Sequence, residues 1–312
     1  METRRIGALD VSLVGLGCNN FGTRLDPEGS AGVIQAALDA GITFFDTADI
    51  YGNGQSEEIL GKALARRRSE VIVATKFGNP FSDDPAQRGA SARWIGEAVE
   101  GSLRRLGTDY IDLYQQHVPD GTVPIEESLT ALDHLVASGK VRAIGNSNFS
   151  AAQIDEAAAV AGDKGLAPFV SAQNHYSLLY TGPRDDIIPA AERNGLAFLP
   201  FFPLASGMLT GKYTRGEPLP AGTRLAGLPA ERAGRLASDR NFALVEALTA
   251  VAEQRGHTIL DLAFAWLTAQ PAIASVIAGA TSAPQIAANV AAGQWTLDAD
   301  DLAAVDAVLA AA

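Results

Sequence analysis

Cysteine and long hydrophobic runs are nearly absent from this chain of 312 residues. Cys18 is the one cysteine, so an intrachain disulfide is excluded. No window reaches the ~18 consecutive apolar residues of a membrane-spanning helix, and aspartates interrupt the alanine-rich segment after Leu297. The first residues lack the apolar core of a signal peptide. We therefore expect a cytoplasmic protein with no membrane partner.

Positive charge is also scarce, since 24 lysines and arginines face 36 aspartates and glutamates, for a net charge of -12. This balance argues against a nucleic-acid partner, although a local basic patch can still bind a small anion. With 47% hydrophobic residues the chain can bury one large core, and we predict a single domain over residues 1–312. The sequence specifies neither a metal site nor an oligomeric state.

Apolar runs alternate with helical periods along the chain, after a short hairpin predicted at residues 3–6 and 11–13. The runs predict eight strands, at residues 14–17, 42–45, 71–75, 111–114, 141–144, 169–172, 196–199 and 274–277. Each strand but the last is followed by helix, and right-handed crossovers of this kind close into a parallel barrel. We therefore predict a (β/α)8 TIM barrel with an N-terminal β-hairpin.

An open doubly wound sheet is the rival architecture. It is disfavoured because the string GLGCNN from Gly15 lacks the third glycine of the dinucleotide fingerprint. The first helix begins with the capping pair Asp26 and Pro27 and runs up to Gly41. Further helices are predicted at residues 56–65, 92–106, 125–137, 151–161, 186–194, 241–255 and 259–269.

Polar residues end the predicted strands, and in a parallel barrel such ends gather at one mouth. Lys76, one of only five lysines, ends a buried strand and should pair with Asp46 on the neighbouring strand. A lysine beside the phenol of Tyr51 would lower the pKa of that phenol. Taken singly, Asp46 and Lys76 could instead form a purely structural ion pair. His117 could instead be an ordinary polar residue with no catalytic role. The other polar ends are Asn146, Ser147, Asn148, Gln173, Asn174 and His175.

These motifs resemble the aldo-keto reductases over nearly the whole chain, and in particular the branch that includes potassium-channel β subunits and their bacterial relatives. The resemblance rests on Asp46 with Tyr51, the string YGNGQSEEILGKAL, Lys76 in ATKFG and His117 in DLYQQHVPD. It implies an NADPH-dependent reductase of aldehydes or ketones, in which a hydride passes from nicotinamide C4 to the carbonyl carbon. Tyr51 would donate the proton, Lys76 and Asp46 would adjust the acidity of Tyr51, and His117 would orient the carbonyl.

The resemblance also implies cofactor-binding residues, with NADP(H) preferred over NAD(H). Phe201 would stack on the nicotinamide where the family usually has Tyr or Trp, and Phe202 replaces a usual Ser without an evident reason. In the family the helix start after Gly279 holds the 2'-phosphate, and we expect the guanidinium of Arg224 in the long loop to bind the same group. The full set is Ser147, Asn148, Gln173, Phe201, Pro203, Leu204, Ser206, Gly207, Lys212, Arg224, Gly279, Thr281, Gln285 and Asn289.

The 28 residues between Lys212 and Asn241 show no clear periodicity and are rich in arginine. We predict a long loop that covers the cofactor phosphates, with a solvated surface loop as the alternative. Two rival functions differ in kind from a reductase. One is a slow-turnover NADP(H)-binding redox sensor or regulatory subunit, and the other is a barrel isomerase or lyase without cofactor, which the complete cofactor segments disfavour.

Overall fold

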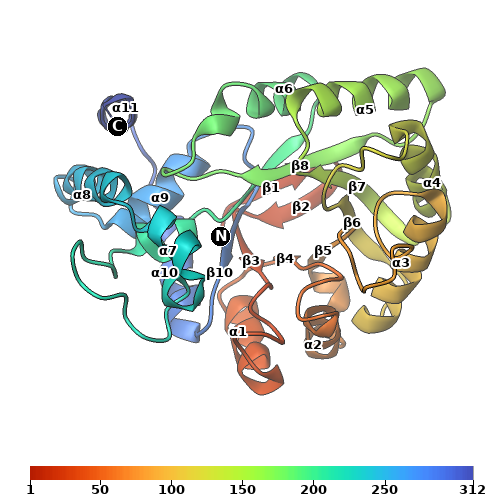
Figure 1. Ribbon diagram of the computed structural model, residues 1–312, viewed down its shortest axis with the longest axis horizontal. Coiled ribbons are helices and arrows are strands. Elements are labelled where there is room, and N and C mark those ends of the chain that lie inside the picture. Colours follow the sequence, from red (N-terminus) through yellow and green to blue (C-terminus); the bar gives the residue numbers. More distant parts are fainter. Residues whose placement is uncertain (312) are drawn as a thin grey trace.

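Residues 1–311 are described by the structure, a computed structural model. Within them, eight parallel strands form one sheet in the order β10-β3-β4-β5-β6-β7-β8-β9. The sheet closes because Phe198 N donates to Ala272 O at 2.7 Å and Ala274 N donates to Phe198 O at 3.2 Å. The predicted TIM barrel is confirmed (Figure 1). Its strands are β3 (Val14–Gly17), β4 (Phe44–Asp46), β5 (Ile72–Phe77), β6 (Ile111–Gln116), β7 (Val141–Ser147), β8 (Phe169–His175), β9 (Ala197–Phe201) and β10 (Val276–Gly279).

Helices surround the barrel, and the largest apolar cluster lies between them and the outer faces of the strands. The predicted start of the first helix is confirmed, because the Asp26 side chain accepts a hydrogen bond from Gly29 N at 2.8 Å. The main helices are α1 (Pro27–Asp39), α2 (Gln55–Leu64), α3 (Ala92–Leu106), α4 (Ile125–Ala137), α5 (Ala151–Lys164), α6 (Ile187–Arg193), α8 (Asp239–Glu253), α9 (Ile259–Thr268), α10 (Ala283–Ala292) and α11 (Ala299–Ala310).

The long segment after Lys212 is more ordered than the sequence predicts. It contains a 3-10 turn, η4 (Leu225–Gly227), and a helix, α7 (Ala230–Leu236). The helix has only seven residues and buries Ala233 alone, so it has no apolar face whose period could be recognised. The prediction of an irregular loop is therefore wrong for these residues.

The N-terminal hairpin closes one end of the barrel. Its strands β1 (Thr3–Ile6) and β2 (Leu9–Ser12) are antiparallel, and Ile6, Leu9 and Val11 join the apolar cluster inside the barrel. Gly7 in the turn lies against Val170 near the start of β8. Because the hairpin covers the amino ends of the strands, only the carboxyl ends remain open for a site.

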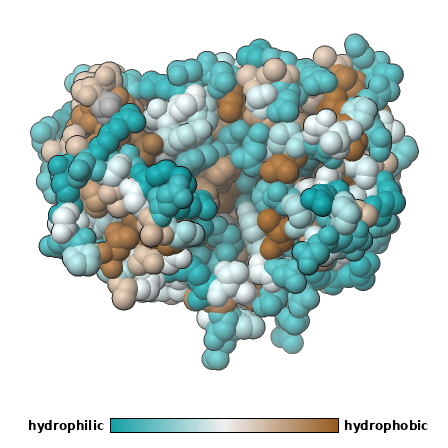
Figure 2. Space-filling model, in the orientation of Figure 1, coloured by the Kyte–Doolittle hydropathy of each residue, from teal (hydrophilic) through white to brown (hydrophobic). Residues whose placement is uncertain are grey.

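The pairing of β3 with β10 joins the two ends of the sequence in one sheet. On this basis we propose that the chain forms a single domain, and residue 312 of that predicted range lies outside the described residues. None of the helices within residues 1–311 is long and apolar enough to cross a membrane. Figure 2 shows that one face of the molecule is hollowed near its centre and that hydrophobic residues lie in the hollow.

Two glycines inside helices give a test of how tightly the outer layer is packed. A Cβ at Gly61 in α2 would overlap the carbonyl oxygen of Leu106 at the end of α3, whereas a Cβ at Gly96 in α3 meets nothing. Gly61→Ala should therefore lower the free energy of unfolding by about 1–3 kcal/mol, the usual cost of overpacking. Gly96→Ala, the matched control, should raise it by up to about 1 kcal/mol. Urea unfolding curves measure both, and equal effects would contradict the close contact.

Candidate active site

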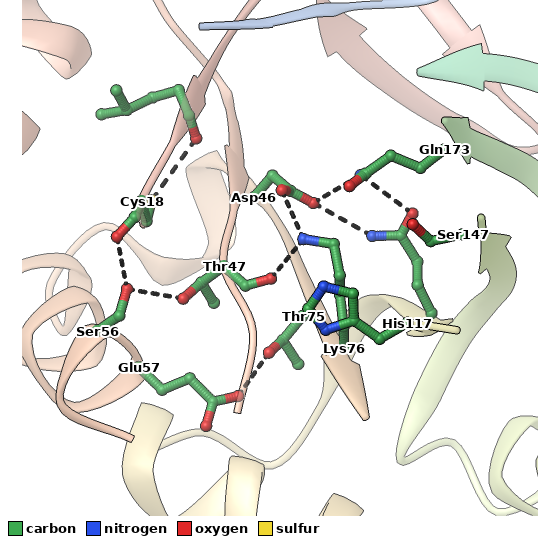
Figure 3. Close-up of polar contacts among 12 residues, drawn as sticks. Cys18, Asp46, Thr47, Ser56, Glu57, Thr75, Lys76, His117, Ser147 and Gln173 are labelled. Atoms are coloured by element: carbon green, nitrogen blue, oxygen red, sulfur yellow. Dashed lines mark hydrogen bonds and ion pairs between the residues drawn. The ribbon is translucent and has the colours of Figure 1, made fainter. Parts of the chain in front are cut away.

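Lys76 and Asp46 form a buried ion pair at the mouth of the barrel. Asp46 ends β4 and Lys76 lies near the end of β5, and their side chains are 5% and 0% exposed. Lys76 Nζ donates to Asp46 Oδ2 at 2.6 Å and to the carbonyl oxygen of Thr47 at 2.8 Å (Figure 3). Burial alone lowers the pKa of Lys76, but Asp46 and Tyr51 outweigh burial and raise it. The lysine is therefore charged, as the sequence predicts.

The second oxygen of Asp46 is held by two amides. Gln173 Nε2 donates to Asp46 Oδ1 at 2.9 Å (Figure 3). Gln115 Nε2 donates to the same oxygen at 3.2 Å. A buried carboxylate needs such partners to offset its lost hydration. The sequence predicts a site role for Gln173 but not for Gln115. A polar residue within the buried strand β6 is the feature that could have indicated Gln115.

Tyr51 and His117 complete the set of four predicted residues. Lys76 Nζ lies 5.1 Å from the centre of the Tyr51 ring. The His117 ring lies 5.9 Å from the Tyr51 ring, at an angle of 82°. Tyr51 comes just before a tight turn in which Gly52, Asn53 and Gly54 all have positive φ, so the chain reverses at once into α2. All four side chains lie at the carboxyl ends of neighbouring strands.

Burial sets the protonation of both rings. It raises the pKa of Tyr51, and the nearby charge of Lys76 opposes this rise without reversing it. The expected lowering of the Tyr51 pKa is therefore wrong as a net effect, because desolvation of the phenolate exceeds the attraction of the lysine. Burial, followed by Lys76, lowers the pKa of His117 to about 3. Near neutral pH the site thus holds a neutral phenol and a neutral imidazole beside one ammonium group.

Two buried acids that the sequence reasoning missed lie next to the strand that carries Lys76. Glu57 accepts from Thr75 Oγ1 at 2.5 Å and from Arg105 Nε at 2.6 Å, so its charge is paired. Asp49 N donates to the carbonyl oxygen of Lys76 at 3.1 Å. The Asp49 side chain is buried, and neither of its oxygens has a hydrogen-bond partner among residues 1–311. Burial, followed by repulsion from Glu57, raises the pKa of Asp49 to about 8.

This raised pKa predicts a pH-dependent loss of stability. Between pH 4 and pH 8 the unfolded chain releases the Asp49 proton while the folded chain retains it, so rising pH favours unfolding through this group. Asp49→Asn lacks this term. The difference in free energy of unfolding between Asp49→Asn and the parent should therefore shift in favour of the variant from pH 5 to pH 8, by on the order of a few kcal/mol. Above pH 8 this difference should stay constant.

Urea unfolding at pH 5, 7, 8 and 9 measures this difference. Asp83→Asn is the matched control, because it makes the same replacement at an exposed side chain. Parallel curves for the parent and Asp49→Asn would contradict the assignment of a buried, protonated acid.

The residues predicted to hold the nicotinamide end lie beside the ion pair. Ser147 ends β7 and is buried, and Asn148 follows it with a φ of 61°. Asn148 Nδ2 donates to the carbonyl oxygen of His117 at 2.9 Å and to Ser147 Oγ at 3.1 Å. These bonds join the ends of β6 and β7, so Ser147 and Asn148 lie next to His117. Gln173 lies next to Asp46, to which it donates.

The segment after β9 has an unusual backbone. Phe202, Ala205 and Ser206 have φ values of 51°, 46° and 58°, in the left-handed region that such residues rarely adopt, and Gly207 follows with 97°. A Cβ at Gly207 would lie 2.6 Å from Lys212 Cε, so the side chain of Lys212 folds back over the glycine. Within this segment Pro203 is buried and Leu204 is partly buried. A cation over a bare stretch of backbone fits a phosphate group.

Arg224 is held between two distant parts of the chain. Its guanidinium donates to Asn19 Oδ1 at 3.4 Å and to Asn20 Oδ1 at 3.3 Å. Asn20 Nδ2 in turn donates to the carbonyl oxygen of Ala280 at 3.2 Å. The loop after β3 therefore links Arg224 to the loop after β10. The sequence reasoning missed both asparagines, since nothing local indicates this contact.

The loop after β10 holds the last group of predicted residues. Gln285 Oε1 accepts from Thr281 N at 2.8 Å and from Thr281 Oγ1 at 3.2 Å, which closes the turn before α10. Gly279 is exposed, whereas Asn289 is buried within α10. Burial lowers the pKa of Arg224, and the nearby positive charges of Arg24 and Arg232 lower it further. In an acidic protein this local excess of positive charge fits an anionic ligand.

The fold and the polar mouth together define a class of barrel enzymes that reduce carbonyl groups. The chain belongs to the aldo/keto reductase family, whose model matches residues 13–310. It is an NAD(P)H-dependent oxidoreductase that acts on carbonyl or CH–OH groups of a small molecule, and members of this family generally use NADP(H). The resemblance seen in the sequence is confirmed.

Relatives with different descriptions match most of the chain. A probable voltage-gated potassium channel subunit beta from Oryza sativa subsp. japonica is 38% identical over 277 residues, which cover 86% of this chain and 83% of the relative. Aldo-keto reductase YhdN from Bacillus subtilis (strain 168) is 37% identical over 308 residues, with coverages of 96% and 91%. L-glyceraldehyde 3-phosphate reductase from Escherichia coli (strain K12) is 31% identical over 315 residues, with coverages of 97% and 88%.

Proposed function

We propose that this protein reduces aldehydes or ketones with NADPH and that Tyr51 donates the proton. The observation that carries the proposal is the arrangement of Lys76, which pairs with Asp46 at 2.6 Å and lies 5.1 Å from the Tyr51 ring centre. When bound, NADPH supplies a hydride from nicotinamide C4 to the carbonyl carbon. The carbonyl oxygen then gains negative charge, and the residues at the mouth must supply a proton to it.

Each of the four residues has a distinct task in this reaction. Tyr51 stays protonated until the step because burial raises its pKa. Lys76 stabilises the phenolate that remains after the proton has left, and Asp46 holds the ammonium group in place. His117 is neutral, because its pKa is lowered to about 3, so it can donate one hydrogen bond to the carbonyl oxygen without adding a charge.

Removal of the Tyr51 hydroxyl tests the proton donor. Tyr51→Phe keeps the ring against His117 but cannot give a proton, so carbonyl reduction should fall by about 10² or more while the Kd for NADPH changes little. Steady-state NADPH oxidation and fluorescence titration measure the two effects. Tyr110→Phe is the control, since Tyr110 precedes β6 and its ring lies under Arg68 and Arg142. Near-normal turnover in Tyr51→Phe would refute the assignment.

The proposed cofactor site runs from the ion pair to the loop after β10. Gln173 already donates to Asp46, so its amide oxygen remains to accept from the nicotinamide carboxamide, beside Ser147 and Asn148. Phe201 is proposed to stack on the nicotinamide ring. The pyrophosphate is assigned to Pro203, Leu204, Ser206, Gly207 and Lys212, and the adenosine with its 2'-phosphate to Arg224, Gly279, Thr281, Gln285 and Asn289.

The proposal also includes a preference for NADPH over NADH, and replacement of Arg224 tests this preference. The NADPH 2'-phosphate carries up to about two negative charges, which a guanidinium can bind through two hydrogen bonds. Arg224→Ala should therefore weaken NADPH binding by roughly 1.5–3 kcal/mol and leave NADH nearly unchanged.

Dissociation constants for both cofactors at fixed salt measure this difference. Arg215→Ala is the matched control, because Arg215 lies in the same segment and bonds to Glu246 at 2.9 Å. Equal losses for NADPH and NADH would show that Arg224 does not read the phosphate. A parent that prefers NADH would refute the NADPH preference itself.

A redox-sensing subunit that holds NADPH and turns over slowly is the second candidate. The observation that favours it is the match to relatives described as potassium channel β subunits. NADPH oxidation with a panel of aldehydes separates the two functions, because a sensor would bind NADPH tightly with negligible turnover.

A further inference from the structure

Three rings form a stack beside the mouth of the barrel. His175, the last residue of β8, lies between Tyr180 and Phe201. The His175 and Tyr180 ring centres are 4.3 Å apart with an angle of 4° between the planes, and those of His175 and Phe201 are 5.6 Å apart with an angle of 13°. All three planes are therefore nearly parallel. Phe201 itself remains partly exposed.

Phe202 holds the stack from the side. Its ring is nearly perpendicular to the Phe201 ring at 5.3 Å and to the His175 ring at 5.8 Å. Edge-to-face contacts of this kind are favourable and fix the angle between rings. Phe202 adopts a φ of 51°, a strained conformation that the surrounding contacts must maintain. The phenylalanine that had no evident reason in the sequence is thus part of this cluster.

The imidazole in the stack is neutral near neutral pH. Burial, followed by the charge of Arg232, lowers the pKa of His175 to about 4. No carboxylate is paired with His175 in the part of the chain that the structure describes. The side chain therefore contributes a flat, uncharged ring that lies against Phe201.

We propose that His175 is a positioning residue for the cofactor, which fixes the plane of Phe201 so that the ring can stack on the nicotinamide. The inference rests on the proposed function, because it takes Phe201 as the stacking ring. Without the imidazole, one face of Phe201 loses its support and the ring can tilt. We expect the cost to fall on the nicotinamide end of the cofactor, since the rings that His175 contacts are those of Tyr180, Phe201 and Phe202, and none of these residues is assigned to a phosphate.

Calorimetric titration with two ligands tests this inference. NADPH carries the nicotinamide, and 2'-phospho-ADP-ribose is the same molecule without it. His175→Ala should weaken NADPH by about 3- to 10-fold, the scale of one aromatic pair, and leave the affinity for the fragment unchanged. His175→Phe, which restores a flat ring, should bind NADPH within about twofold of the parent. Tyr180→Ala should show a smaller loss in the same direction, and Tyr180 is exposed and so lies outside the buried core.

Three results would overturn the inference. His175→Ala could bind NADPH as tightly as the parent, it could lose affinity for both ligands equally, or His175→Phe could be as weak as His175→Ala. Failure of the proposed function looks different, because the parent itself would then bind neither NADPH nor the fragment. Thermal melting of each variant without ligand verifies that a loss of affinity does not come from unfolding.

Discussion

The buried ion pair between Lys76 and Asp46 is the constraint on which the site depends. Two charges with side chains 0% and 5% exposed are stable only if each is fully coordinated, because desolvation costs several kcal/mol per ion. The barrel meets this demand with strands that end side by side: β4 and β5 pair in register, and amides from β6 and β8 reach the same carboxylate. Closure of the sheet is therefore a condition of the chemistry as well as of the fold.

The surrounding acids determine how the charge of Lys76 acts. Glu57 is paired with Arg105 but still repels Asp49, and burial together with this repulsion raises the pKa of Asp49 to about 8, so this carboxyl is uncharged near neutral pH. An ionised Asp49 would add a second negative charge beside the strand that carries Lys76 and would offset the lysine. With Asp49 protonated, the charge of Lys76 still acts on the pKa of Tyr51, against the opposing charge of Asp46. The burial that destabilises the fold at higher pH thus serves the electrostatics of the site.

The sequence predicts the barrel and the meeting of Asp46, Lys76 and His117, because strand periodicity and the topology of parallel barrels decide where strand ends lie. It cannot predict contacts between residues far apart in the chain. Asn20 joins Arg224 to Ala280 across more than half of the sequence, and no local pattern marks it. The sequence also cannot predict whether the pKa of Tyr51 is raised or lowered. The direction depends on the balance between burial and a nearby charge, and burial is known only from the fold.

Phe202 shows how the two ends of the proposed cofactor site are joined. Its ring contacts Phe201 and His175 on one side, and the Arg224 guanidinium lies 5.2 Å from its centre on another. One strained residue therefore touches both the ring assigned to the nicotinamide and the cation assigned to the 2'-phosphate. Strain of about 1–3 kcal/mol persists only where neighbours hold it. The contacts with His175, Phe201 and Arg224 therefore maintain the strained backbone of Phe202, and they keep its ring against the edge of Phe201.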